Sequence, residues 1–517
     1  MAGRRRGRIG GGVEVLDSIY SVVALVFILV ACVELGDAAT AVDVYRLIQY
    51  DIAGVPYGSR LAGLNHHAGA SFFAPGADLS RTVVMMPVRE LNLTFLREYI
   101  ISNQPLGGLL LLLPEKVGNR IVGKIKSKDD GLMRNILVEL EQLLIHANIP
   151  YPVYFAFEDD KINAVLADVR RNDATGQPPM ATTGGYKLLV SIPEPKRVSS
   201  PTITNIQGWL PGLKGDGDTN QLPTIAVVAS YDTFGAAPAL SVGSDSNGSG
   251  VVALLEIARL FSRLYSNPKT RGRYNLLFGL TSGGPYNYDG TLKSLSDVAN
   301  ELGVTIGIKH KKINISNPRV AWEHEQFSRL RITAVTLSEL SAAPELLEST
   351  GGLHDTRDSL DEAAVYRTIR LVAESLAKHI YGHQGRNIQI FADNSSLAIN
   401  PFYISAWLDL LSRAPRVAPF LSKTDPIISS LKKELSDHTV ELHVQHETID
   451  GMFSFYDSTR ATLNVYQVAS VAFDLLLLLA LGAYLILLFS FLVLTTRGLD
   501  DLINLFRRPP SRKVKAA

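Results

Sequence analysis

Two aspartates stand where an α/β sheet would place a metal site. Residues 225–229 form a predicted buried strand, and Asp232 follows its end; a Gly- and Ser-rich turn then brings Asp245 to the start of an apolar helix at residues 251–264. In α/β sheets, ligands collect at the carboxyl ends of strands and at helix N-termini. Carboxylates are ligands of divalent metals. The spacing therefore marks Asp232 and Asp245 as the place where a metal site would be built.

The turn before this helix carries a family resemblance. The run Asp245-Ser246-Asn247-Gly248-Ser249-Gly250 resembles the motif with which the zinc aminopeptidase superfamily supplies a metal-bridging carboxylate. In that superfamily the preceding strand ends in His-x-Asp, whereas this chain has Ser230-Tyr231-Asp232. A neutral hydroxyl is a poor zinc ligand compared with imidazole, thiolate or carboxylate. The resemblance therefore implies a peptidase scaffold that no longer binds zinc.

Other positions of the family site have also changed. A strand at residues 274–281 ends, in active relatives, in a Glu-Glu pair that supplies the general base and a metal ligand; this chain continues with Ser282, Gly283 and Gly284. Neither Gly nor Ser can take a proton from a zinc-bound water at neutral pH. His354 matches the last zinc ligand of the family. We therefore expect no catalytic residue, no metal and no cofactor, and a vestigial site at Ser230, Asp232, Asp245, Gly283, Gly284 and His354.

Length and charge limit the other classes of function. The chain has 517 residues, enough for two or three domains, with 51 basic and 50 acidic side chains and a net charge of +1. No long basic run lies in its centre, which argues against nucleic acid as a partner. The single cysteine, Cys32, lies in an apolar N-terminal segment, so disulfides cannot stabilise the large domain.

The N-terminus has the layout of a secretory signal. An Arg-rich start precedes an apolar run at residues 19–33 and small residues up to Ala41. We therefore predict a signal peptide at residues 1–41, with an uncleaved signal anchor as the alternative.

The other end predicts a membrane span. Residues 475–494 carry no formal charge, and 20 residues at about 1.5 Å each cover roughly 30 Å, the thickness of a bilayer core. We expect the transmembrane helix within residues 469–494 and a basic cytosolic tail at 495–517, which places the bulk of the chain in the lumen. Asp474 stands at the lumenal mouth of the span. It either reaches headgroup water or contacts a partner's membrane helix.

Between these ends the sequence predicts an α/β protein with three regions. We expect an N-terminal small α/β part at residues 42–195, a three-layer aminopeptidase-like domain with a mixed sheet at 196–382, and a juxtamembrane lumenal region at 383–468. Family members have a further strand near residues 290–304, where this chain offers only a short helix at 292–302. An internal stretch of the family domain is therefore missing.

Periodicity places the individual elements. Alternating or continuous apolar runs predict strands, and apolar residues at helical spacing predict helices. Strands are expected at residues 82–87, 108–113, 151–157, 203–209 (an edge strand), 304–308 and 332–337, and around Val440, Leu442 and Val444. Helices are expected at residues 132–146, around 431–435, and at 360–381 with Asp358 or Ser359 as N-cap.

Four sequons stand at Asn92, Asn247, Asn314 and Asn394. A lumenal location makes Asn92, Asn314 and Asn394 candidate glycan acceptors, whereas Asn247 lies in the site loop and is expected to be shielded.

The whole chain resembles the nicastrin/nicalin branch of the superfamily, and within it the nicalin family. The agreement runs from Val44-Tyr45-Arg46 and Gln49-Tyr50-Asp51 through Pro56-Tyr57-Gly58 and the glycine-rich turn. It continues to Ala321-Trp322-Glu323-His324-Glu325 and Phe473-Asp474-Leu475. This resemblance implies a single-pass endoplasmic-reticulum protein with a non-catalytic lumenal domain. It also implies three partners: the Nodal modulator protein, a small multi-pass membrane protein and the Sec61 translocon, in a complex that assists insertion of multi-pass membrane proteins. An active secretory-pathway zinc aminopeptidase and a nicastrin-like substrate receptor of an intramembrane protease are the alternatives.

Overall fold

The computed structural model describes residues 40–72, 78–114, 128–174, 185–199, 201–215, 221–282, 322, 324–329, 332–338, 351–382, 389–448, 453–457, 459–468 and 471–496. Several predictions fall outside these residues: the signal up to residue 39, the helix at 292–302 with the missing stretch, the strand at 304–308, Gly283, Gly284, Asn314 and the tail from 497.

The first part of the chain, predicted as a small α/β part, contributes most strands of a closed barrel. The barrel closes because a strand from near the C-terminus, β15, pairs antiparallel with both β1 and β9. Its order is β1 (Thr40–Arg46), β15 (Arg460–Gln467), β9 (Tyr186–Val190), β4 (Leu64–Gly69), β5 (Thr82–Pro87), β6 (Gly108–Leu113) and β8 (Val153–Phe157). The predictions for β5 and β6 are confirmed. Because β1 begins at Thr40, a signal cut near Ala41 would remove its first pairs with β15.

The apolar residues of the barrel strands alternate between two cores. One set comes from all seven strands, includes Val83, Met85 and Tyr154, and fills the interior together with helix α4 (Asp160–Asp173). The other set, which includes Val84 and Phe155, packs outside against α2 (Leu93–Ile101) and α3 (Lys128–His146). Short 3-10 turns, η1 (Leu79–Arg81) and η2 (Val88–Glu90), flank β5.

A small sheet lies beside the barrel and also joins distant parts of the chain. Its order is β14 (Phe453–Phe455), β2 (Gln49–Ile52), β3 (Val55–Ser59) and β7 (Asn148–Ile149). Tyr50 of β2 stacks between Tyr57 and Phe455 at centroid distances of 5.3 and 6.2 Å. Gly58 has a φ of +76°, and a Cβ there would meet the Ile48 carbonyl, so this position requires glycine.

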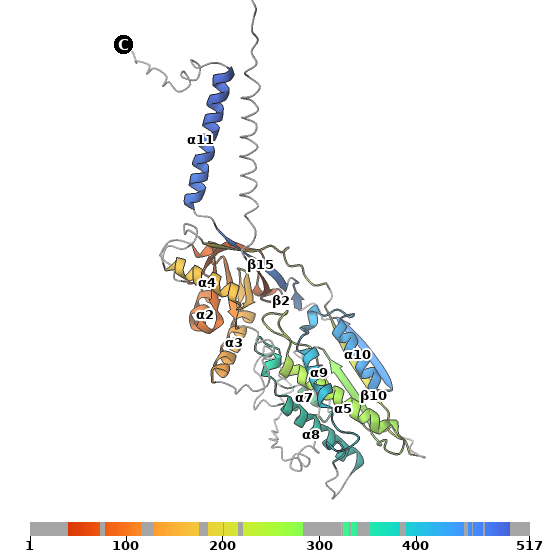
Figure 1. The fold of residues 1–517 in the computed structure, drawn as a ribbon. Helices are drawn as coiled ribbons and strands as arrows, with labels where there is room; N and C mark the ends of the chain where they lie inside the picture. Colours follow the sequence, from red (N-terminus) through yellow and green to blue (C-terminus); the bar gives the residue numbers. More distant parts are fainter. Residues whose placement is uncertain are drawn as a thin grey trace, which may run out of the picture.

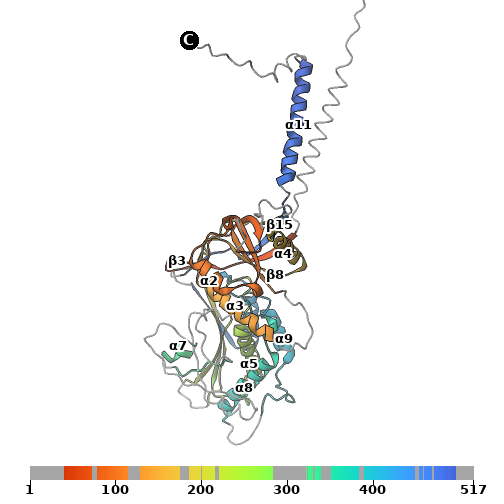
Figure 2. The same cartoon turned by 90° about the vertical axis from the view of Figure 1, so that its left-hand side faces the viewer.

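The second unit is a mixed sheet covered by helices, as the sequence predicts. Its order is β11 (Thr224–Ser230), β12 (Asn275–Thr281), β10 (Thr202–Leu210) and β13 (Glu441–Thr448), with β11 parallel to β12 and the other pairs antiparallel. Four helices share its main apolar core: α5 (Ser249–Ser266), α8 (Glu362–Tyr381), α9 (Pro401–Leu411) and α10 (Pro426–His438). Figure 1 shows these helices below the barrel, and Figure 2 shows the short helix α7 (His324–Arg329) on the other side of the sheet from α5 and α8.

Three local predictions are wrong. Residues 203–209 were expected at a sheet edge, but β10 lies inside the sheet because β13 pairs along its free side. Residues 332–337 form no strand: they are largely exposed and pair with no strand among the described residues. The N-cap of α8 is Asp361, whose carboxylate accepts the Ala363 N–H at 3.0 Å, rather than Asp358 or Ser359, which form the 3-10 turn η6 (Arg357–Ser359).

Residues 383–468, predicted as one juxtamembrane region, contribute to both units. α9, α10 and β13 belong to the second unit, while β14 and β15 complete the sheets of the first. The 3-10 turn η7 (Ala418–Phe420) contacts both units, because it lies against β10 and its Phe420 packs on Phe455 of β14. The first unit therefore depends on strands from both ends of the chain.

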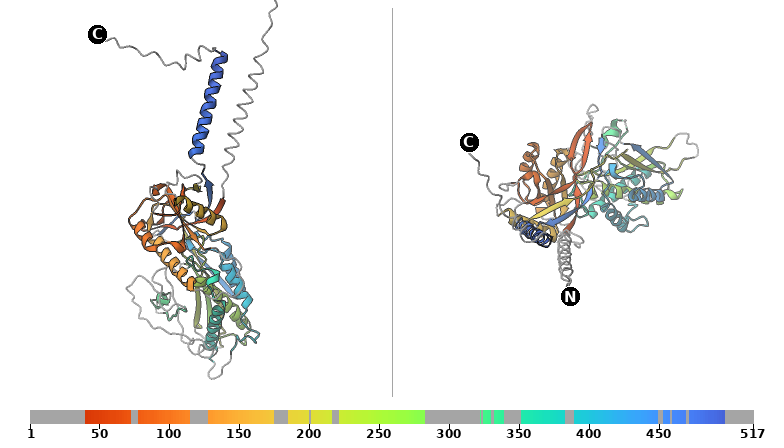
Figure 3. Two further views of the ribbon diagram at one scale, coloured as in Figure 1. Left: turned by 60° about the vertical axis from the view of Figure 1, so that its left-hand side comes forward. Right: turned by 90° about the horizontal axis from the view of Figure 1, so that it is seen from above.

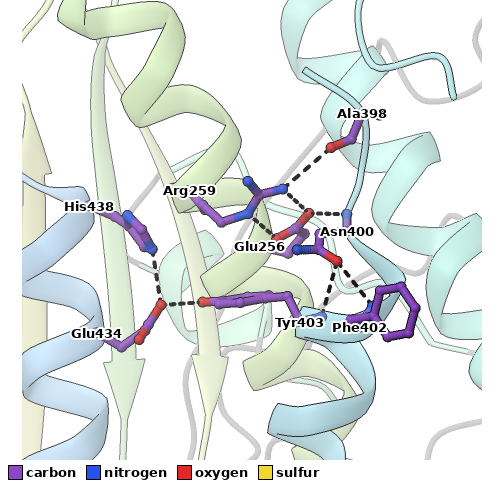
Figure 4. A network of polar contacts seen from close by, with 8 residues as sticks. All are labelled: Glu256, Arg259, Ala398, Asn400, Phe402, Tyr403, Glu434 and His438. Carbon is purple, nitrogen blue, oxygen red and sulfur yellow. Dashed lines mark hydrogen bonds and ion pairs between the residues drawn. The ribbon is translucent and has the colours of Figure 1, made fainter. Parts of the chain in front are cut away.

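The helix layer of the second unit is held by a buried ion pair on α5. Both oxygens of Glu256 accept from the Arg259 guanidinium at 2.6 Å, and one of them also accepts the Asn400 N–H at 2.9 Å. Arg259 lies over the Tyr403 ring of α9, and the Tyr403 hydroxyl donates to Glu434 of α10 at 2.6 Å. Figure 4 shows the network linking α5, α9 and α10. Each buried charge thus has its partners, as burial requires.

One described helix is long and apolar enough to cross a membrane. α11 (Val471–Thr496) contains the window Leu477–Thr496, with a mean hydropathy of 2.8 and most of its surface exposed. The predicted span at residues 475–494 lies inside it. In Figure 1 and in the left view of Figure 3, α11 stands clear of both folded units.

Candidate active-site remnant

Of the predicted site residues that the structure describes, Ser230 ends β11, and Asp232, Asp245 and His354 lie in loops near the carboxyl end of this strand. We call residues 230–248 and 351–356 the strand-end loops. Ser230 is register-paired with Thr281, and their hydroxyl oxygens are 3.1 Å apart. The position that a metal-binding histidine would occupy therefore holds a hydroxyl that bonds to the neighbouring strand.

Asp232 and Asn247 are buried together. The Asn247 side-chain amide donates to the Asp232 backbone oxygen, and Asp232 is 1% exposed. The sequon asparagine therefore has a structural partner, which joins the start of the first strand-end loop to its end.

Asp245 lies in a short π-helical turn, Ser244–Gly248, that leads into α5. Its side chain is exposed, but its backbone N–H donates to Asp355 Oδ1 at 2.7 Å, and the Ser246 N–H donates to Asp355 Oδ2 at 3.1 Å. The Ser246 hydroxyl bonds to the same carboxylate. Asp355 thus satisfies the helix N-terminus, where a negative charge is favoured. Sequence reasoning missed Asp355, because a cap supplied from 110 residues away leaves no local signal.

His354 lies next to this carboxylate. Burial and the nearby Arg134 lower the pKa of its imidazole, so the neutral form is favoured. Its Nδ1 atom is buried and has no hydrogen-bond partner among the described residues. The charged neighbours of His354 are Arg134 and the adjacent Asp355, while Gly283 and Gly284 lie outside the described residues.

A buried arginine, which the sequence did not indicate, lies at the centre of the loops. Arg416 is fully buried, and its guanidinium donates to the carbonyls of Tyr231 at 2.6 Å and Gly243 at 3.0 Å, and to those of Leu411 and Ala414. Burial lowers its pKa to about 10, while Asp355 and Asp232 oppose this change. Arg416 therefore stays charged at neutral pH beside the two carboxylates.

The backbone of Arg416 completes this junction. The Thr233 N–H donates to the Arg416 carbonyl at 2.9 Å, and the Arg416 N–H donates to the Ser241 carbonyl at 3.3 Å. Arg416, five residues beyond the end of α9, therefore holds Thr233 and Ser241 of the first strand-end loop together.

Helix α3 of the first unit closes the outer side of the loops. Glu141 of α3 is buried, and its carboxylate accepts the Ala236 N–H at 3.1 Å and the Leu353 N–H at 2.9 Å. Ala236 and Ala237 belong to the same apolar core as α3. A Cβ on Gly352 would lie 2.3 Å from a Glu141 oxygen, so the loop backbone approaches this carboxylate closely. The strand-end loops are therefore packed against the first unit.

This set of donors does not fit a zinc site. Ser230 is bonded to Thr281, the Asp355 oxygens bind backbone amides, and Glu141 binds two more. Within the described ranges, no three His, Cys, Asp or Glu side chains are grouped to hold a metal ion. The contacts of Asp355 and Glu141 instead satisfy buried polar groups of the two loops.

The Glu141 contact can be tested by changing one atom of the side chain. Glu141→Gln leaves only one oxygen to accept two amides, and its NH₂ group would face a backbone N–H, so we expect a loss of about 2–3 kcal/mol in the free energy of unfolding. Glu139→Gln is the matched control on the same helix: Glu139 is half exposed and pairs with Arg97 at 3.4 Å, so its change should cost at most about 0.5 kcal/mol. Denaturant unfolding of the two full-length variants measures both. Equal losses would show that Glu141 does not hold the loops.

Comparison with known proteins identifies relatives of this chain. Residues 223–316 match the family model "Nicastrin large lobe". The chain is 32% identical to BOS complex subunit NCLN of Rattus norvegicus and 31% identical to that of Homo sapiens, in both cases over 87% of this chain and 88% of the relative. Nicalin of Caenorhabditis elegans is 28% identical over 66% of this chain and 69% of its own.

A solved structure shares the fold. The crystal structure of the gamma-secretase component Nicastrin superposes with a TM-score of 0.54 at 10% identity, covering 84% of this chain and 100% of that one. At this identity the likeness concerns the fold alone. From the identity and coverage of its sequence relatives, the chain belongs to the nicalin family.

Proposed function

We propose that this chain is a non-catalytic, membrane-anchored scaffold built on a zinc-aminopeptidase-like domain. The observation that carries the proposal is the closure of the strand-end loops by Arg416 and Glu141. A hydrolase needs an accessible pocket and a base that takes a proton from water. Here α3 packs against the strand-end loops, and the carboxylates of Glu141 and Asp355 bind backbone amides.

The family relation supports a role in a complex. The relatives are named BOS complex subunits, and we propose that this chain is the corresponding subunit. Its partners are then the Nodal modulator protein, a small multi-pass membrane protein and the Sec61 translocon. The complex would assist insertion of multi-pass membrane proteins at the endoplasmic reticulum. The chain would contribute a rigid lumenal body and one membrane helix, with Asp474, at the fourth position of α11, as a candidate contact to a partner's helix.

The fold likeness to Nicastrin favours one second candidate, a substrate receptor of an intramembrane protease. Purification from gentle detergent separates the two. We expect translocon components and the two named membrane partners to co-purify with the full-length chain, without stoichiometric zinc. Recovery of an intramembrane protease instead would favour the second candidate. Bound zinc together with peptide hydrolysis that Asp245→Ala abolishes would show an active aminopeptidase.

The proposed lumenal topology predicts a glycosylation pattern. Asn92 and Asn394 are exposed, whereas the Asn247 side chain is buried against Asp232. Asn92→Gln and Asn394→Gln should each remove one glycosidase-sensitive step in gel mobility. Asn247→Gln should remove none. Absence of any glycosidase-sensitive shift in the unaltered chain would contradict a lumenal location.

A further inference from the structure

The barrel has one end that must lie close to the membrane if α11 crosses it. Strands β1 and β15 are antiparallel, so the start of β1 at Thr40 and the end of β15 at Gln467 lie at the same mouth of the barrel. α11 begins at Val471, four steps along the chain from Gln467. At about 3.5 Å for each residue, these steps reach at most about 14 Å.

The start of α11 fixes how far this mouth lies from the lipid. The most apolar window begins at Leu477, so residues 471–476 precede the hydrocarbon core. Six helical residues rise about 9 Å, close to the thickness of one headgroup layer of roughly 5–8 Å. Val471 therefore lies near the outer surface of the headgroups. The strand ends at this mouth lie within about 14 Å of that surface.

Helix α4 lies across this mouth. It follows the carboxyl end of β8, which pairs antiparallel with β1 and so ends at the same mouth. At its other end, the Asp173 carboxylate accepts the Ala70 N–H at 2.7 Å, just past the end of β4, and Asp168 accepts from the Tyr186 hydroxyl at 3.0 Å. β8 and β4 are not neighbours in the barrel, so α4 spans its opening.

The two faces of α4 are distinct. Its buried residues join the core inside the barrel: Ile162, Val165, Leu166 and Val169. The opposite face therefore points away from the barrel, on the side where α11 leaves. Figures 1 and 2 both show α4 directly beneath the base of α11, and the right view of Figure 3 shows the two close together from above.

The outward face is small in its middle and charged near both ends. Ala164 and Ala167 are exposed between Lys161 and Arg171, which are also exposed. Small side chains allow the helix backbone to approach a flat surface. Acidic groups lie on and beside this helix. On α4 itself, Asp160 is exposed and Asp168 pairs with Arg171 at 3.0 Å; Glu90 of η2 pairs with Arg170.

We propose that this outward face of α4 rests on the phospholipid headgroups of the bilayer that α11 crosses, with Lys161 and Arg171 contacting lipid phosphates. The inference rests on the proposed membrane anchoring. The bilayer is assigned as the occupant because the short link to α11 brings this mouth to the membrane surface. The contact would hold the barrel upright and keep the second unit away from the membrane.

A label on α4 tests the proposal in the full-length chain. In a Cys32→Ser background, the variant Ala164→Cys carries a fluorophore on its single cysteine. The protein is placed in phosphatidylcholine vesicles that contain a lipid with a nitroxide quencher on its headgroup. Ala406→Cys is the matched control, an exposed helical alanine on α9 in the second unit. We expect quenching at residue 164 at least threefold stronger than at 406. Equal quenching in protein that floats with the vesicles would overturn the inference and leave the anchoring intact. Failure to float would overturn the proposed anchoring, and the inference with it.

A second variant tests the two basic residues. Lys161→Glu with Arg171→Glu changes only exposed side chains, so folding and flotation should persist while quenching at residue 164 falls at least twofold. Unchanged quenching would overturn the assignment of Lys161 and Arg171 to lipid phosphates.

Discussion

The buried guanidinium of Arg416 is the constraint on which the second unit depends. Taking a charge out of water costs several kcal/mol, and here backbone carbonyls from two separate segments offset that cost. Because the donors of a guanidinium lie in a rigid plane, these carbonyls have fixed positions. The first strand-end loop, which includes the turn before α5, and the end of α9 are thereby held in one arrangement.

The junction between the units follows from the same loops. Glu141 reaches from α3 into the strand-end loops, and its carboxylate replaces water for two buried amides. Apolar residues on both sides extend the contact into one core. The strand-end loops are thus the surface by which the two units join.

The sequence predicted much of this fold because the relevant signals are local. Continuous apolar runs such as Gly108–Leu113 identify buried strands, and the apolar spacing within α5 and the uncharged run of α11 identify their helices. Long-range pairing has no such signal. Nothing near β10 shows that β13 covers its edge, and nothing near β1 shows that β15 closes the barrel.

The candidate site, too, could be predicted only in part from the sequence. The sequence placed Ser230 and Asp232 at the end of β11 and Asp245 in the turn before α5, because a strand and a helix flank them. The interactions that hold the loops could not be predicted, because Asp355, Arg416 and Glu141 reach the loops from distant segments. Arg416 in particular stands in a short stretch of Ala, Pro and Val with no recognisable motif, and only its burial reveals its role.

Hydrogen–deuterium exchange of the full-length chain tests the central claim most directly. If the strand-end loops are a closed structural junction, the amides of Thr233, Ala236, Asp245 and Leu353 should exchange as slowly as those of strand β12. Neither zinc nor a chelator should change their rates. Fast exchange at these amides that slows when zinc is added would contradict the account, because it would reveal an open, metal-organised site.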